Sequence, residues 1–198
     1  MKQSCVNVEE LGKKLENGEI VVYPTDTVWG LGCLPGNEAA VDKIYEIKGR
    51  DRSKPLILMS DDIANLLPYV SELPEKAIKL IYKHFPGALT IVVKKSDLTP
   101  DFVTSGKNTV GIRVPANKTF SELCKKIPGH VLATTSANFS GDNPVKNYEE
   151  AFFTFSGDTE LIFEDEGEKP KGVASTVVGV IDDTVKIFRQ GSIEVSEG

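Results

Sequence analysis

The sequence predicts an α/β protein with a single domain, residues 1–198, built on a twisted, mixed parallel and antiparallel sheet flanked by helices. Three observations lead to this prediction. The chain has 198 residues, 40% of them hydrophobic and 26% charged, which is typical of one globular domain with a sizeable core. Helical and extended patterns alternate along most of the chain. Within 88–114 and 175–188, however, strands follow strands directly, so a purely parallel sheet is not expected.

Capping residues mark the helices of the first half. Asn7 and Glu10 have the spacing of a capping box and Gly18 is a stop signal, so a helix is expected over 7–18. Asn37 and Gly49 frame a second helix in the same way. The other elements expected here are a strand at 19–24, a turn and loop at 23–32, a strand at 55–59, a short helix within 61–70 and a helix at 74–85.

The second half begins with two strands and ends with a hairpin. The strands at 88–95 and 109–114 are separated by a polar loop. Thr119 and Glu122 have capping-box spacing at the start of another helix. Asp182 and Asp183 form the predicted turn of the closing hairpin. The other elements expected here are a strand at 130–135, a loop at 136–144, a helix at 147–155 and hairpin strands at 175–181 and 184–188.

Bulk properties exclude several classes of protein. The N-terminal residues lack the apolar run of a signal peptide, and the longest apolar runs are strand-sized, so a cytoplasmic location without membrane contact is expected. Three cysteines without a CxxC pair and only two histidines do not favour a metal site or a hydrolytic triad. A net charge of −6 argues against broad nucleic-acid binding but permits a local basic groove.

A run of four cations interrupts this acidic chain: Lys48, Arg50, Arg52 and Lys54 fall within seven residues. Such cations repel one another unless they are solvated or share an anion. If the segment is extended, residues 50, 52 and 54 point to the same side, which would suit a polyphosphate. A solvated surface run and a phosphate site are both open at this point.

Polar side chains gather in other loops beside predicted strands, where α/β folds place ligands. Thr25, Asp26 and Thr27 follow the first strand, and Ser136 and Asn138 follow a later one. The remaining candidates of this kind are Arg113, Ser175, Thr176 and Arg189. An arginine inside an apolar strand, as at position 113, needs a partner or a ligand. Cations and hydroxyls without a nucleophile favour charge neutralisation and positioning, as in nucleotidyl transfer.

Six segments, in order, resemble the YrdC/TsaC family of threonylcarbamoyl-AMP synthases: VVYPTDTVWGLGC, KIYEIKGRDRSKPLILM, PGALTIVV, VGIRVP, TTSANFSG and GVASTVV. The resemblance implies a YrdC-like fold with a basic concave face, in the short single-domain form. It implies that L-threonine, bicarbonate and ATP, with Mg²⁺, give threonylcarbamoyl-AMP and pyrophosphate. A partner transferase then modifies tRNA. The assembly would be a monomer or a homodimer.

The resemblance also assigns roles to residues. The family motifs K-x-R and S-x-N fall on the catalytic set of Lys48, Arg50, Ser136 and Asn138. The implied ATP contacts are Arg50, Lys54, Thr109, Ser136, Pro144 and Arg189. The implied threonine and carbamate contacts are Thr27, Met59, Arg113, Thr134 and Ser175.

Departures from the family pattern leave two alternatives. Met59 stands near the place of a histidine, Thr135 replaces a proline, Ala174 replaces a glutamate, and DNPVKN replaces the pattern around Pro144. These changes fit a divergent synthase or a paralogue of the YciO type. Apart from these departures, a module that binds tRNA or other RNA through the basic concavity, without this chemistry, is a third hypothesis. The hydroxyl set favours a small closed pocket over an RNA surface.

Overall fold

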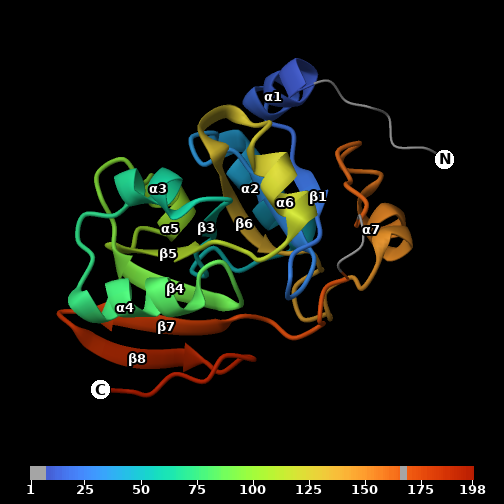
Figure 1. Ribbon diagram of the computed structural model, residues 1–198. Coiled ribbons are helices and arrows are strands. Elements are labelled where there is room, and N and C mark those ends of the chain that lie inside the picture. Colours follow the sequence, from blue (N-terminus) through green and yellow to red (C-terminus); the bar gives the residue numbers. More distant parts are fainter. Residues whose placement is uncertain (1–7, 166–168) are drawn as a thin grey trace.

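A single mixed sheet organises the protein. The computed structural model describes residues 8–165 and 169–198, and these residues include an eight-stranded sheet in the order β1-β2-β6-β3-β5-β4-β7-β8 (Figure 1). Two of the neighbouring pairs are parallel, β3 with β5 and β4 with β7, and the others are antiparallel. The predicted single α/β domain with a mixed sheet is confirmed. Every helix in these residues is too short or too polar to cross a lipid bilayer.

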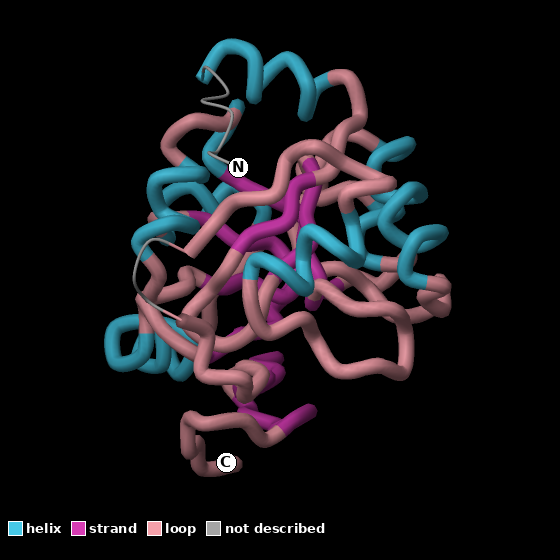
Figure 2. The backbone as a smooth tube through the Cα atoms, turned by 90° about the vertical axis from the view of Figure 1, so that its right-hand side faces the viewer, coloured by secondary structure: helices cyan, strands magenta, loops and turns pink. Residues whose placement is uncertain are grey.

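The elements have the following bounds. The strands are β1 Val21–Tyr23, β2 Gly30–Cys33, β3 Ile57–Ser60, β4 Leu89–Lys94, β5 Thr109–Arg113, β6 Val131–Ser136, β7 Thr176–Ile181 and β8 Thr184–Arg189. The helices are α1 Val8–Glu16, α2 Glu38–Lys48, α3 Ile63–Leu66, α4 Glu75–His84, α5 Asp101–Thr104, α6 Lys118–Cys124 and α7 Tyr148–Phe155, with 3₁₀ turns η1 Leu67–Tyr69 and η2 Pro128–His130. Helices lie on both sides of the strands (Figure 2).

The two faces of the sheet carry different cores because side chains alternate along each strand. One face is covered by apolar residues of α2, α4 and α7, which pack on strand residues such as Leu58 and Ile112. On the other face, α1 and α6 cover only part of the sheet through a smaller cluster around Tyr23 and Phe120. In this smaller cluster, the helical residues come from α1 and α6 alone. The candidate site lies on the same face of the sheet.

Local sequence signals explain most element boundaries. Asn37 caps α2 by accepting from the backbone N–H of Ala40, and Gly49 ends it in the left-handed region at φ 56°. Asp182 and Asp183, with φ of 48° and 56°, form the tight turn between β7 and β8. These three predictions are confirmed. Asn7, the predicted cap of the first helix, lies outside the described residues.

Three local predictions are wrong. Residues 30–33 form strand β2 rather than a loop, because Gly30 and Gly32 make room for the ring of Tyr23. The polar loop after β4 contains the short helix α5. Helix α6 is capped by Asn117, whose side chain accepts from the N–H of Phe120, instead of by a capping box at Thr119. In each case a tertiary contact or a nearer cap prevails over the local pattern.

Candidate functional site

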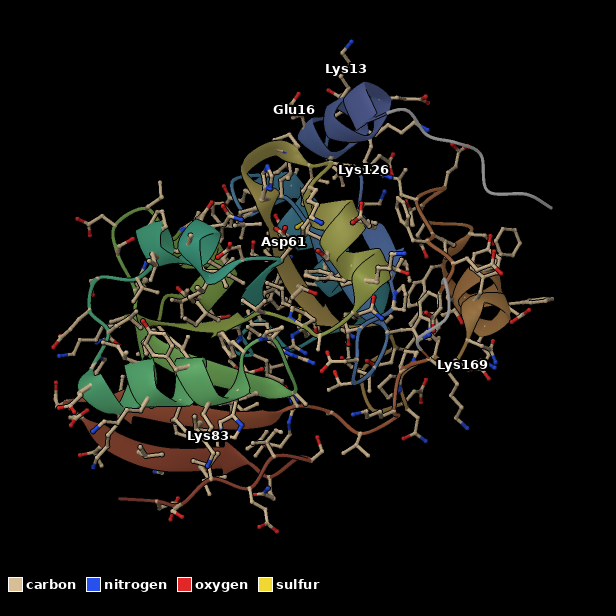
Figure 3. All side chains as sticks on the ribbon, in the orientation of Figure 1. Lys13, Glu16, Asp61, Lys83, Lys126 and Lys169 are labelled. Carbon is tan, nitrogen blue, oxygen red and sulfur yellow. The ribbon has the colours of Figure 1, made fainter. Side chains whose placement is uncertain are left out.

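A cavity of about 320 Å³ opens on the face that α1 and α6 leave uncovered. Its lining is Thr25, Thr27, Val28, Trp29, Gly30, Arg50, Pro55, Ile57, Met59, Thr90, Arg113, Thr134, Thr135, Ser136, Asn138, Asp142, Pro144, Ala174, Ser175, Val177 and Arg189. Three arginines and one aspartate give this lining a formal charge of 3 − 1 = +2. Lys13, Lys83 and Lys169, by contrast, are exposed on the outside of the molecule (Figure 3).

Strand register builds the floor of the cavity. Residues paired across neighbouring strands point to the same side of a sheet. Four such pairs line the cavity, and they come from six consecutive strands: Gly30 with Ser136, Ile57 with Thr134, Met59 with Arg113, and Thr90 with Val177. The sheet therefore brings together residues that are more than a hundred positions apart in the sequence.

Arg113 is the buried cation of the floor, with 2% of its surface exposed. Its guanidinium donates from Nε to the carbonyl of Gly87 at 3.0 Å, from Nη1 to Thr27 Oγ1 at 2.8 Å and from Nη2 to Asp26 Oδ1 at 2.6 Å. Burial lowers the pKa of Arg113, and the Asp26 carboxylate opposes that shift. Arg113 keeps its charge, because a guanidinium pKa is too high for the proton to be lost. The partner that an arginine in an apolar strand requires is Asp26.

The turn that supplies Asp26 is held by its own hydroxyls. Thr25 Oγ1 donates to the carbonyl of Val28 at 2.6 Å and lies 3.0 Å from Thr27 Oγ1. Because the single proton of Thr25 goes to Val28, the proton between the two threonines must come from Thr27. Thr27 therefore donates to Thr25 and accepts from Arg113, and it can offer a ligand only a lone pair.

Ser175 and Arg189 form one side of the cavity. Ser175 is buried, and its hydroxyl lies 2.8 Å from that of Thr90. Arg189 donates from Nε to the carbonyl of Ser175 at 3.0 Å and from Nη2 to its hydroxyl at 3.2 Å. The end of β8 is thereby fixed against the start of β7, with the guanidinium among the lining residues.

The opposite side is a loop held by Lys48. Lys48 is buried and does not line the cavity; its ammonium donates to the carbonyls of Ser136 and Asn138 and to Asn138 Oδ1, at 2.5, 2.7 and 3.1 Å. Ser136 Oγ donates to the same Asn138 oxygen at 2.6 Å. Burial, followed by the charge of Arg50, lowers the pKa of Lys48 to about 7. Lys48 of the K-x-R motif thus binds both Ser136 and Asn138 of the S-x-N motif.

Arg50 alone of the four-cation run lines the cavity. The segment after α2 is a turn closed by the N–H of Lys54 on the carbonyl of Asp51, so the prediction of an extended segment is wrong. Arg50 donates to the carbonyls of Lys54 and Pro55, whereas Arg52 pairs with Asp42. The run is therefore divided between the cavity and the surface because the turn separates its side chains.

Ten of the thirteen predicted site residues line the cavity, and Lys48, Lys54 and Thr109 do not. Lys54 is exposed, and its carbonyl, not its side chain, supports Arg50. Thr109 begins β5, four residues and about 13 Å from Arg113 at an extended rise. Thr134 shares a hydrogen bond with the buried Tyr23 hydroxyl and also donates to the carbonyl of Leu31.

Sequence reasoning missed the importance of three residues. Thr90 is the single polar residue among the first five positions of β4, a signal that was available. Asp142 is the one carboxylate in the described lining, and nothing in its exposed loop distinguished it. Asp26 was noticed as a loop carboxylate, but its pairing with Arg113 depends on bringing positions 26 and 113 together, which no local pattern shows.

Comparisons with known proteins identify a matching family and several relatives. The Sua5/YciO/YrdC family model, described as "Telomere recombination", matches residues 13–191. A threonylcarbamoyl-AMP synthase of Pyrococcus abyssi is 34% identical over 92% of this chain and 53% of its own length. One of Pseudoalteromonas atlantica is 39% identical over 73% of this chain and 78% of its own length. The chain spans about half the length of the Pyrococcus relative.

Two solved structures are similar as well. The crystal structure of P. abyssi Sua5 complexed with L-threonine superposes with a TM-score of 0.84 at 32% identity, covering 94% of this chain and 55% of that one. The crystal structure of E. coli YciO gives 0.80 at 25% identity, covering 95% and 92%. With a family model that matches nearly the whole chain, this protein belongs to the Sua5/YciO/YrdC family.

Proposed function

We propose that this protein is a threonylcarbamoyl-AMP synthase, which joins L-threonine, bicarbonate and ATP. The observation that carries the proposal is the cavity itself: three arginines converge with buried hydroxyls, and its described lining contains no cysteine, histidine or lysine that could act as a covalent nucleophile. Such a site positions substrates that react with each other and neutralises charge. The relatives named for this activity support the same assignment.

The reaction balances without a protein nucleophile. The amine of threonine and bicarbonate form a carbamate and release water. A carbamate oxygen then attacks the α-phosphorus of ATP, and the bond from that phosphorus to the bridging oxygen breaks as pyrophosphate leaves. We assign the phosphates to Arg50, Ser136 and Arg189, with Pro144 at the nucleotide. We assign threonine and its carbamate to Arg113, Thr27, Thr134, Ser175 and Met59.

Lys48 and Asn138 act by holding the end of β6 and the loop that follows it. Lys48 and Asn138 touch each other and the backbone, so we propose that they position Ser136 without contacting substrate. Ser136 gives its one proton to Asn138 in this conformation, and it must redirect that proton to bind a phosphate oxygen. We do not assign Lys54 and Thr109 to ATP, because neither lines the cavity.

Mg²⁺ bound with ATP fits the lining. Mg²⁺ in nucleotide sites is commonly held by one or two carboxylates together with phosphates and water. Asp142 is the one carboxylate that the described lining offers, and it would share the ion with the phosphates. Bound there, Mg²⁺ would neutralise phosphate charge during transfer.

The product implies further partners. A carbamoyl adenylate is an activated acyl donor, so we propose that a downstream transferase passes the threonylcarbamoyl group to tRNA, in the cytoplasm where ATP and tRNA meet. A monomer or a homodimer would serve equally, because the cavity described here is built from one chain.

The test is incubation with ATP, L-threonine and bicarbonate, followed by detection of pyrophosphate and the adenylate. We expect both products only when all three substrates are present. Equal pyrophosphate release without threonine would indicate simple ATP hydrolysis and contradict the proposal. A YciO-type protein is the second candidate, because E. coli YciO matches in length as well as in fold; absence of product under all conditions would favour it.

A further inference from the structure

We propose that Asp26 is a positioning residue, which fixes the plane of the Arg113 guanidinium so that two of its N–H groups face the substrate. The inference rests on the proposed function, in which Arg113 receives the carboxylate or carbamate of threonine. No motif of the chain gave Asp26 this role, and Asp26 does not itself line the cavity. It would act on the reaction only through Arg113.

Donor counting supports the proposal. A guanidinium carries five N–H groups, and three of them are used by Gly87, Thr27 and Asp26. The remaining 5 − 3 = 2 belong one to each terminal nitrogen. A planar anion binds best to two N–H groups presented side by side. The three protein contacts leave one N–H on each terminal nitrogen for a ligand, and together they restrain the rotation of the guanidinium.

Asp26 is itself held in place. Its carboxylate is only 11% exposed in the side chain. Its backbone carbonyl accepts from the N–H of Lys171 at 3.3 Å, and the next carbonyl, of Thr27, accepts from Gly172 at 2.8 Å. The segment entering β7 therefore braces the turn from outside while Arg113 braces it from inside. A fixed carboxylate can orient its partner, whereas a mobile one could not.

Charge and orientation can be separated by substitution. Asp26→Ala removes both the acceptor and the charge. Asp26→Asn keeps an oxygen of the same shape in the same place but leaves the Arg113 charge without a counter-ion. If orientation matters, the asparagine variant should retain threonine binding that the alanine variant loses. Asp97→Asn is the matched control, because Asp97 is exposed and lies outside the cavity lining.

The kinetic arm measures the KM for threonine at saturating ATP and the KM for ATP at saturating threonine. Loss of an oriented charged contact predicts that Asp26→Ala raises the KM for threonine about tenfold or more, with the KM for ATP changed less than about twofold. Asp26→Asn should restore the threonine KM to within about threefold of the wild type. A purely structural Asp26 would instead lower melting temperature and raise both KM values together, which would overturn the proposal.

A second experiment, by NMR, does not depend on catalytic activity. In ¹⁵N-labelled protein, the Nε–H signal of Arg113, assigned by its loss in Arg113→Lys, reports whether the guanidinium is immobilised. We expect a protected signal in the wild type, Asp26→Asn and Asp97→Asn, and rapid solvent exchange in Asp26→Ala. Protection in Asp26→Ala would refute the positioning role. If the wild type releases no pyrophosphate, the proposed synthase activity fails, and this arm still decides whether Asp26 positions Arg113.

Discussion

Arg113 and Lys48 are both buried cations beside the cavity, but they are compensated in different ways. Arg113 pairs with a carboxylate, keeps two N–H groups unused and lines the cavity. Lys48 has three N–H groups and three oxygen acceptors, none of them a carboxylate, and lies behind the loop. The comparison teaches that a buried cation is available to substrate only where its donors outnumber its protein partners.

The largest effect on activity is expected from substitution of Arg50, which lines the cavity and bonds backbone carbonyls instead of a carboxylate. A charge-assisted bond to phosphate contributes about 1.5–3 kcal/mol, so Arg50→Ala should lower kcat/KM for ATP about 100-fold. Steady-state pyrophosphate release at varied ATP measures this. Arg52→Ala is the control, because Arg52 pairs with Asp42 outside the lining. If both variants lose activity equally, the four cations act together through their combined positive charge. The division of these residues between cavity and surface would then be wrong.

Gly30→Ala should disturb the floor of the cavity at strand β2. A Cβ at this position would lie 2.6 Å from a ring carbon of Tyr23, which is fully buried and packed on Phe120. Overpacking of this kind costs about 1–3 kcal/mol in the free energy of unfolding. Chemical denaturation measures it, with Gly36→Ala as control because nothing lies within 4 Å of that Cβ. Equal stability of the two variants would show that the floor adjusts easily.

Lys48→Met tests the loop side of the comparison. The variant keeps an unbranched side chain, one atom shorter than lysine, and loses the three bonds to Ser136 and Asn138. We expect the KM for ATP to rise about tenfold, because a neighbouring loop that is no longer fixed misplaces Ser136. The KM for threonine should stay close to that of the wild type. A matching rise in the threonine KM would mean that Lys48 supports the whole cavity.

A smaller effect should appear in the pH dependence of stability. The pKa of Lys48 is about 7 in the folded protein, against 10.5 for an ordinary lysine. Between pH 7 and pH 10.5 the unfolded chain binds a proton at Lys48 that the folded protein does not bind. The contribution of Lys48 to the free energy of unfolding therefore becomes more favourable to the folded protein as the pH rises through this range. Denaturation of the wild type and Lys48→Met at several pH values should show a difference that grows in favour of the wild type. A constant difference would show that the three oxygens keep Lys48 charged.

Much of the fold could be predicted because its signals are local. The caps of α2, the Asp182–Asp183 turn and the successive strands at 88–114 all lie within short segments. Strand β2 could not be predicted, because glycine has poor strand propensity. Glycine is needed at positions 30 and 32 because the ring of Tyr23 lies against them. The cap of α6 was misplaced by two residues because Asn117 and Thr119 are both good caps.

Most of the residues predicted for the site line one cavity, but the sequence did not show how they bind one another. Motif resemblance indicated Lys48, Ser136 and Asn138, yet it did not show that these residues bind one another. The pairing of Asp26 with Arg113 joins the turn after β1 to strand β5 across 87 positions. Such contacts follow from strand order, and a single sequence does not determine strand order.

The most direct test of the central claim is the affinity for L-threonine of the wild type and of Arg113→Lys, measured by calorimetry alongside the affinity for ATP. Lysine keeps the charge but lacks the two N–H groups side by side. We predict that threonine binding weakens about tenfold or more while ATP binding changes less than about twofold. Normal threonine binding in a variant that melts at a markedly lower temperature would contradict this account, because Arg113 would then be only the structural partner of Asp26.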